Sequence, residues 1–104
     1  YIIMKVEIKS SPMKDKRLVA IFFDDNNKKI KTTHFGLKNP KIGAFPDHNN
    51  EKLKTNYLKR HNPKVTNENW NDMFSAGALS RWILWNKKTI KESIEDFKRR
   101  FKLK

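Results

Sequence analysis

The sequence predicts an α+β domain: a three-stranded antiparallel meander followed by three helices packed on one face of the sheet. Two observations support it. Three strand-like apolar runs separated by turn residues fill the first 35 positions, and helical spacings with capping residues fill the second half. A chain of 104 residues suits one small basic domain over residues 1–104. Its 37% hydrophobic content favours a folded domain over a disordered basic tail.

The three predicted strands cover residues 2–9, 18–23 and 29–35. In the first, apolar Ile2, Met4, Val6 and Ile8 alternate with polar residues, which is typical of a half-buried strand. The second is apolar almost throughout. Residues 24–27 read DDNN, a turn composition, so the second and third strands are expected to form a hairpin.

Helices are expected after a loop at residues 36–46, which glycine and proline punctuate. The first helix covers residues 50–61 and is stopped by an Asn-Pro pair. An ordered loop follows at residues 64–71. The second helix covers residues 72–85 with Asp72 as its N-cap. The third begins with a capping box at Thr89 and Glu92 and carries an apolar stripe at spacings of four, three and four: Ile90, Ile94, Phe97 and Phe101.

The formal net charge of the chain is +13, yet the charge is uneven. Between residues 65 and 85, Arg81 is the single cation, and that stretch holds all three tryptophans. The pattern indicates an aromatic core segment inside a positive shell, which favours a polyanion or an acidic partner. An AT-rich genome would also enrich lysine, so a merely solvated lysine surface is the alternative.

Little in the sequence indicates an enzyme, so we expect neither a catalytic site nor a cofactor. The chain has no cysteine, no phosphate-binding glycine loop and no nucleophile motif. The acidic pair Asp24 and Asp25 is explained by the turn. The start does not resemble a secretory signal, and no apolar run is long enough to span a membrane.

Three histidines carry the one catalytic alternative. His34 ends a strand, while His48 and His61 flank the first helix. Three imidazoles can hold Zn²⁺ and leave a position for water, with Asp47 orienting a ligand. The plainer interpretation is that His34 packs or hydrogen-bonds at the strand end and that His61 caps carbonyls.

The basic residues of the second half are the stronger signal, because cations on one face can neutralise phosphates without reading sequence. Trp70, in a loop, is the candidate for stacking on bases. Trp82 and Trp85 are expected in the core, and Arg81 in an ion pair with Glu68 or Asp72. The predicted phosphate contacts are Lys52, Lys59, Arg60, Lys87, Lys88, Lys98, Arg99, Arg100 and Lys102.

Several segments together resemble a family of small basic proteins of nucleocytoplasmic large DNA viruses (giant viruses). They are residues 32–36 (TTHFG), 57–61, 68–72 (ENWND), 75–86 (SAGALSRWILWN) and 97–101 (FKRRF). The resemblance covers roughly residues 17–101, and residues 75–86 are its most specific part. It implies a viral setting but no mechanism, because that family has no established function.

The expected function is sequence-nonspecific nucleic-acid binding, with DNA favoured over RNA, in genome compaction, packaging or a replication compartment. The chain would then reside in the virion or in a cytoplasmic virus factory. One alternative is a minor capsid or core protein whose basic surface docks on acidic virion proteins or a membrane. The other is the zinc enzyme built on the three histidines.

Overall fold

The computed structural model describes residues 4–37 and 44–104. Strands β1 (Lys5–Ser10), β2 (Lys16–Phe23) and β3 (Lys29–Leu37) form one antiparallel sheet in the order β1-β2-β3. The predicted meander is therefore confirmed. The expected strand start at residues 2–3 and most of the expected glycine-proline loop, residues 38–43, lie outside the described residues.

The sheet has one face buried beneath the helices. The register places Val6 opposite Phe22 and Leu18 opposite Phe35, so these side chains share one face. Phe22 and Phe35 are both fully buried, and they join Leu79, Ile83 and Phe97 of the helical half in one core. Burial of these large side chains is the main force holding helices to the sheet.

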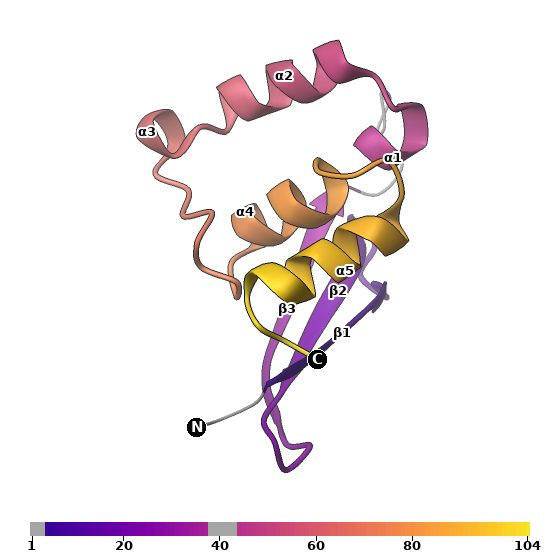
Figure 1. Ribbon diagram of the computed structural model, residues 1–104, viewed down its shortest axis with the longest axis vertical. Coiled ribbons are helices and arrows are strands. Elements are labelled where there is room, and N and C mark those ends of the chain that lie inside the picture. The colour runs from indigo at the N-terminus through magenta and orange to yellow at the C-terminus, as the bar shows by residue number, and fades with distance from the viewer. Residues whose placement is uncertain (1–3, 38–43) are drawn as a thin grey trace.

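The helical half lies on one side of the sheet (Figure 1). Helix α4 and the π-helix η1 contact β3, and α5 packs on η1, whereas α2 stands farther out and is joined through α1. The α+β class is confirmed. The bounds are α1 (Phe45–His48), α2 (Glu51–Arg60), α3 (Pro63–Thr66), α4 (Ala76–Leu79), η1 (Ser80–Leu84) and α5 (Ile90–Arg100).

Two of the predicted helices, the one over residues 50–61 and the one that begins at Thr89, are confirmed as α2 and α5. Asn50 caps α2 by accepting hydrogen bonds from the backbone N–H groups of Lys52 and Leu53. The Thr89 hydroxyl accepts from the Glu92 N–H at the start of α5, so Thr89 is the N-cap. The Glu92 carboxylate accepts from the Thr89 hydroxyl instead of from the Thr89 N–H, so the predicted capping box forms only in part. Short helices α1 and α3 occupy segments predicted as loops, because Pro46 and Pro63 each stand in a first helical turn, where proline is favoured.

The predicted helix over residues 72–85 is shorter and differently built. Asp72 does not cap it: its carboxylate accepts from the Phe74 N–H in a turn. Ser75 is the N-cap instead, accepting from the Ala78 N–H. After Leu79 the backbone widens into the π-helix η1, which a periodicity of 3.6 does not reveal. The wider turn sets where Trp82 and Trp85 point.

Candidate functional site

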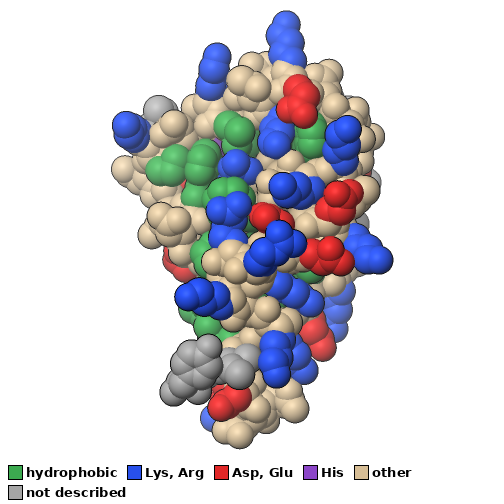
Figure 2. Space-filling view, viewed as in Figure 1, with side chains coloured by type: hydrophobic (Ala, Val, Ile, Leu, Met, Phe, Trp, Pro, Cys, Tyr) green, Lys and Arg blue, Asp and Glu red, His purple; other side chains and the backbone are tan. Residues whose placement is uncertain are grey.

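The cations of the helical half are mostly free of acidic partners. Over residues 4–37 and 44–104, the ion pairs are Arg17 with Asp47, His61 with Glu68, and Arg100 with Asp96. Of the predicted phosphate contacts, only Arg100 belongs to one of these ion pairs. Those that are exposed are Lys52, Lys59, Arg60, Lys87, Lys88, Arg99 and Lys102, and Lys98 is half-buried. Figure 2 shows Lys and Arg side chains spread over this side, with some Asp and Glu between them.

A hydrogen-bond chain joins the basic residues of α2 to those of α5. The Lys54 ammonium donates to the Asn86 carbonyl at 2.8 Å. The Asn86 amide donates to Asp96 at 2.7 Å, and Asp96 also accepts from Arg100 at 3.4 Å. Helices α2 and α5 run in the same direction, with residues 86–89 at one end of both (Figure 1). We call the cations of α2, of residues 87–88 and of residues 98–102 the basic face.

These cations are close enough to repel one another. Burial is the main cause that lowers the pKa of Lys54, and the positive charges of Arg81 and Lys87 lower it further against the opposing charge of Glu51. Burial likewise lowers the pKa of Arg81, and Arg100 adds to the effect. An anion placed on this face would relieve that repulsion.

Arg81 does not form the predicted ion pair with Glu68 or Asp72. Its guanidinium donates to the Trp85 carbonyl at 2.8 Å and lies over the rings of Trp82 and Trp70, with centroid distances of 4.2 and 5.3 Å. Arg100 also lies over Trp82, at 3.6 Å. Stacking on aromatic faces therefore replaces a carboxylate partner. Trp70 is half-buried beside Arg81, and its role in base stacking stays a prediction.

A second cluster of aromatic rings connects α2 to the core. Tyr57 stacks on Trp85 with 4.5 Å between ring centroids and on His61 with 4.2 Å. His48 lies on Trp85 at 5.7 Å. Burial is the main cause that raises the pKa of the Tyr57 phenol, and the charge of Glu68 adds to it. Tyr57 therefore remains a neutral phenol. Trp82 and Trp85 are half-buried against the core, in agreement with the sequence prediction.

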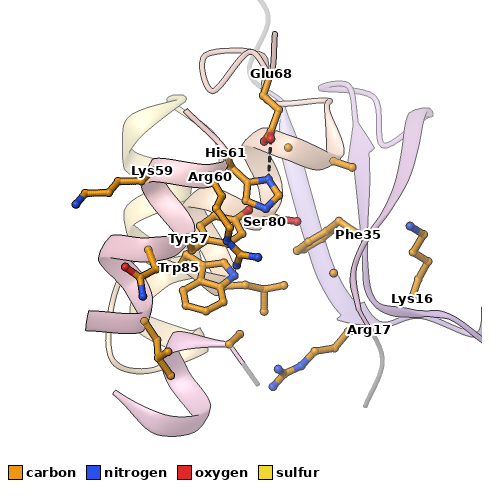
Figure 3. A pocket seen from close by; sticks show the side chains of 17 residues that line it. Lys16, Arg17, Phe35, Tyr57, Lys59, Arg60, His61, Glu68, Ser80 and Trp85 are labelled. Carbon is orange, nitrogen blue, oxygen red and sulfur yellow. Dashed lines mark hydrogen bonds and ion pairs between the residues drawn. The ribbon is translucent and has the colours of Figure 1, made fainter. Parts of the chain in front are cut away.

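A cavity of about 1010 Å³ opens between α2 and the sheet (Figure 3). Its apolar lining includes Phe35 of β3 and Leu84 of η1, and Arg17, Lys59 and Arg60 stand among its cations. The His61 imidazole and the Glu68 carboxylate approach to 2.7 Å at one end. The sequence did not reveal this cavity, because its walls come from strand, π-helix and α2, far apart along the chain.

The three histidines have separate partners. The His34 ring hydrogen-bonds the Ser11 hydroxyl at 2.7 Å, and His61 bonds Glu68. His48 accepts from the Asn50 N–H and lies on Trp85. Asp47, the expected orienting group, is held by both terminal nitrogens of Arg17 instead. Among the residues with described positions, no group of three metal-ligating side chains could hold a metal ion. None of the described helices is long and apolar enough to cross a membrane.

Comparison with known proteins places the chain in an uncharacterised family. The model of a family of unknown function (DUF5754) matches residues 6–61, which cover the sheet, α1 and α2. The chain belongs to that family. No curated protein and no solved structure matches it. The matched part includes the β3 and α2 walls of the cavity, and η1 and α5 lie beyond it.

Proposed function

We propose that this protein binds nucleic acid without sequence preference through its basic face. Lysine and arginine side chains that neutralise phosphates release condensed counterions, which favours binding to any strand. The basic residues come from α2, from the turn at residues 87–88 that precedes α5, and from the end of α5, so one surface can follow several consecutive phosphates. DNA is the favoured nucleic acid.

The observation that carries this proposal is the lack of carboxylate partners. Within the described part of the chain, only Arg100 of the predicted phosphate contacts takes part in an ion pair, and that pair is long at 3.4 Å. Burial lowers the pKa of Lys54, and the nearby positive charges of Arg81 and Lys87 lower it further. A folded surface that keeps such cations close together gains free energy when an anion neutralises them.

The resemblance to small basic proteins of large DNA viruses supplies the setting of the proposal. A nonspecific binder would act in genome compaction, packaging or a replication compartment of such a virus. Its place would be the virion or a cytoplasmic virus factory. If the basic face instead meets acidic virion proteins or an anionic membrane, the protein is a structural component of the particle.

The test is a titration of the purified protein with a fluorescently labelled random DNA duplex and a matching single strand, each at two salt concentrations. Binding should weaken steeply with salt, and log K should fall linearly with log salt. The test variant is K87E/K88E/R99E, which reverses three exposed charges. Arg100 is spared because it packs on Trp82. Each lost phosphate contact should reduce the salt slope by about 1.

A matched control has the same total charge. K14E/K28E/K29E reverses three exposed lysines outside the basic face: Lys14 in the turn between β1 and β2, Lys28 in the turn between β2 and β3, and Lys29 at the start of β3. The proposal expects a loss of at least about tenfold in affinity for the first variant and a much smaller loss for the control. Equal losses in both variants would mean that net charge alone drives binding. No binding at low salt would overturn the proposal and favour the virion structural role.

A further inference from the structure

We propose that the cavity between α2 and the sheet accepts one unpaired nucleotide, with its base inside and its phosphate at the cationic rim. For a nucleotide within a strand, this inference rests on the function proposed above. A free nucleotide has the same chemistry and needs no such support. The cavity volume, about 1010 Å³, stands at the upper end of the roughly 300–1,000 Å³ typical of small-molecule pockets.

The interior of the cavity suits a flat, largely apolar ring. Phe35 and Leu84 line it with hydrocarbon, and both are nearly or fully buried. Gly36 and Gly77 also line it without side chains. A Cβ atom at Gly36 would come within 2.6 Å of Leu84, so the β3 backbone and the Leu84 side chain are in close contact at this position. A base entering this space would exchange water contacts for apolar ones.

One polar group at the end of the cavity beside His61 favours a base over an acyl chain. The Glu68 carboxylate uses Oε2 to bond His61 at 2.7 Å. Its Oε1 is buried and meets no hydrogen-bond donor among the described protein atoms. A buried acceptor without a donor is costly, and a ligand N–H would satisfy it. Exocyclic amino groups of adenine, cytosine and guanine are such donors, whereas a hydrocarbon chain has none.

The rim supplies the charge that a phosphate requires. Arg60 extends from α2 beside the Tyr57 ring, and Lys59 points away from the cavity (Figure 3). Arg60 is exposed and belongs to no ion pair within residues 4–37 and 44–104. Its planar guanidinium can bind two phosphate oxygens at once. Arg17 lines the cavity too, but Asp47 already occupies its guanidinium.

The experiment uses two variants at exposed positions of the cavity. Ala76→Phe places a ring at the start of α4, where Ala76 is exposed and lines the cavity. Arg60→Gln removes the rim charge. Asn71→Phe and Lys64→Gln are the matched controls, since both residues are exposed and neither lines the cavity. Thermal unfolding verifies that all four variants fold.

Each protein is titrated with a random duplex, with oligo(dC) and oligo(dT) of equal length, and with cytidine monophosphate. Wild-type protein should bind oligo(dC) about tenfold more tightly than oligo(dT) at equal salt, because cytosine alone has the amino group for Glu68. Ala76→Phe and Arg60→Gln should reduce oligo(dC) binding several-fold more than the two controls do. Ala76→Phe should leave duplex binding unchanged.

The outcomes separate this inference from the proposed function. Duplex binding with no oligo(dC) preference and no effect of Ala76→Phe overturns the cavity inference and leaves the proposed function standing. If no strand binds, the proposed function fails, and cytidine monophosphate decides the cavity: saturable binding lost in Ala76→Phe supports it, and no binding overturns it. If the protein binds both the duplex and oligo(dC), saturable binding of cytidine monophosphate identifies a free nucleotide as a ligand. No binding of the monophosphate then assigns the site to nucleotides within strands.

Discussion

Tyr57 and Trp85 stack face to face, with ring centroids 4.5 Å apart and planes 7° from parallel. The first residue lies on α2, and the second directly follows η1. Helix α2 packs less closely on the sheet than α4 does. The stacked pair of Tyr57 and Trp85 therefore links the outer helix to the core. It also forms one wall of the cavity. Stability of the outer helix and shape of the cavity therefore depend on the same two rings.

Replacing Trp85 by alanine should loosen α2 before it unfolds the sheet. Loss of a large, half-buried ring should lower the free energy of unfolding by about 3 kcal/mol. Native-state hydrogen exchange should show faster exchange for α2 amides than the global change accounts for. Trp85→Phe keeps a stacking partner for Tyr57 and should lose less. Unchanged α2 protection in Trp85→Ala would show that other contacts hold the helix.

Gly36 is the position where β3 tolerates no side chain. Its φ is +81°, and an added Cβ would stand 2.6 Å from Leu84. Gly36→Ala should therefore lower the free energy of unfolding by about 1–3 kcal/mol in urea denaturation. Gly77→Ala is the control, because Gly77 has no positive φ and the added Cβ would meet only the Glu68 side chain, nearest at its Oε1 atom at 2.8 Å. A smaller loss at Gly36 than at Gly77 would contradict this account of the strand.

The pair of Arg17 and Asp47 should make stability depend on acid. Hydrogen bonds from Arg17 hold the pKa of Asp47 below its ordinary value. Stability from this pair is thus present above the unfolded pKa of about 3.9 and is lost as pH falls through the lower folded pKa. The pair is partly exposed, so the effect should be about 0.2–1 kcal/mol.

The Asp47→Asn variant tests this pH dependence, because an amide keeps an acceptor for the Ala44 N–H but has no charge. Urea midpoints at neutral pH should fall slightly, and the difference from wild type should shrink towards low pH. Asp15→Asn, at an exposed carboxylate outside the ion pairs, is the reference for a general charge effect. A difference that stays constant down to pH 2 would be inconsistent with the prediction.

Thr89 should stabilise α5 through its hydroxyl. The Glu92 N–H donates to that hydroxyl at 3.1 Å, which satisfies one of the free groups in the first turn. Thr89→Ala should cost about 1 kcal/mol in the free energy of unfolding, and Thr89→Ser should retain most of it. Equal loss in both variants would mean that the Thr89 methyl group, and not the hydrogen bond, is responsible.

Local patterns in the chain were enough to predict the sheet and the two capped helices. Alternation over Val6 and Ile8 depends only on the two-residue period of a strand, and Asn50 and Thr89 act on backbone groups two or three residues away. Asp24 similarly accepts from the N–H groups of Asn26 and Lys28 within its own turn. Such features involve few residues, so neighbours in sequence suffice to define them.

Contacts between residues distant in sequence are set by the tertiary structure and could not be predicted from local patterns. Arg81 was expected beside a carboxylate. In the fold its guanidinium lies over Trp82 and donates to the Trp85 carbonyl, while the Glu68 carboxylate bonds His61. The π-helix η1, which packs against α5, has no signal in the local sequence pattern. The count of cations was evident from the sequence, whereas the cavity depends on how α2, η1 and β3 meet in space, where each contact is set by all the others.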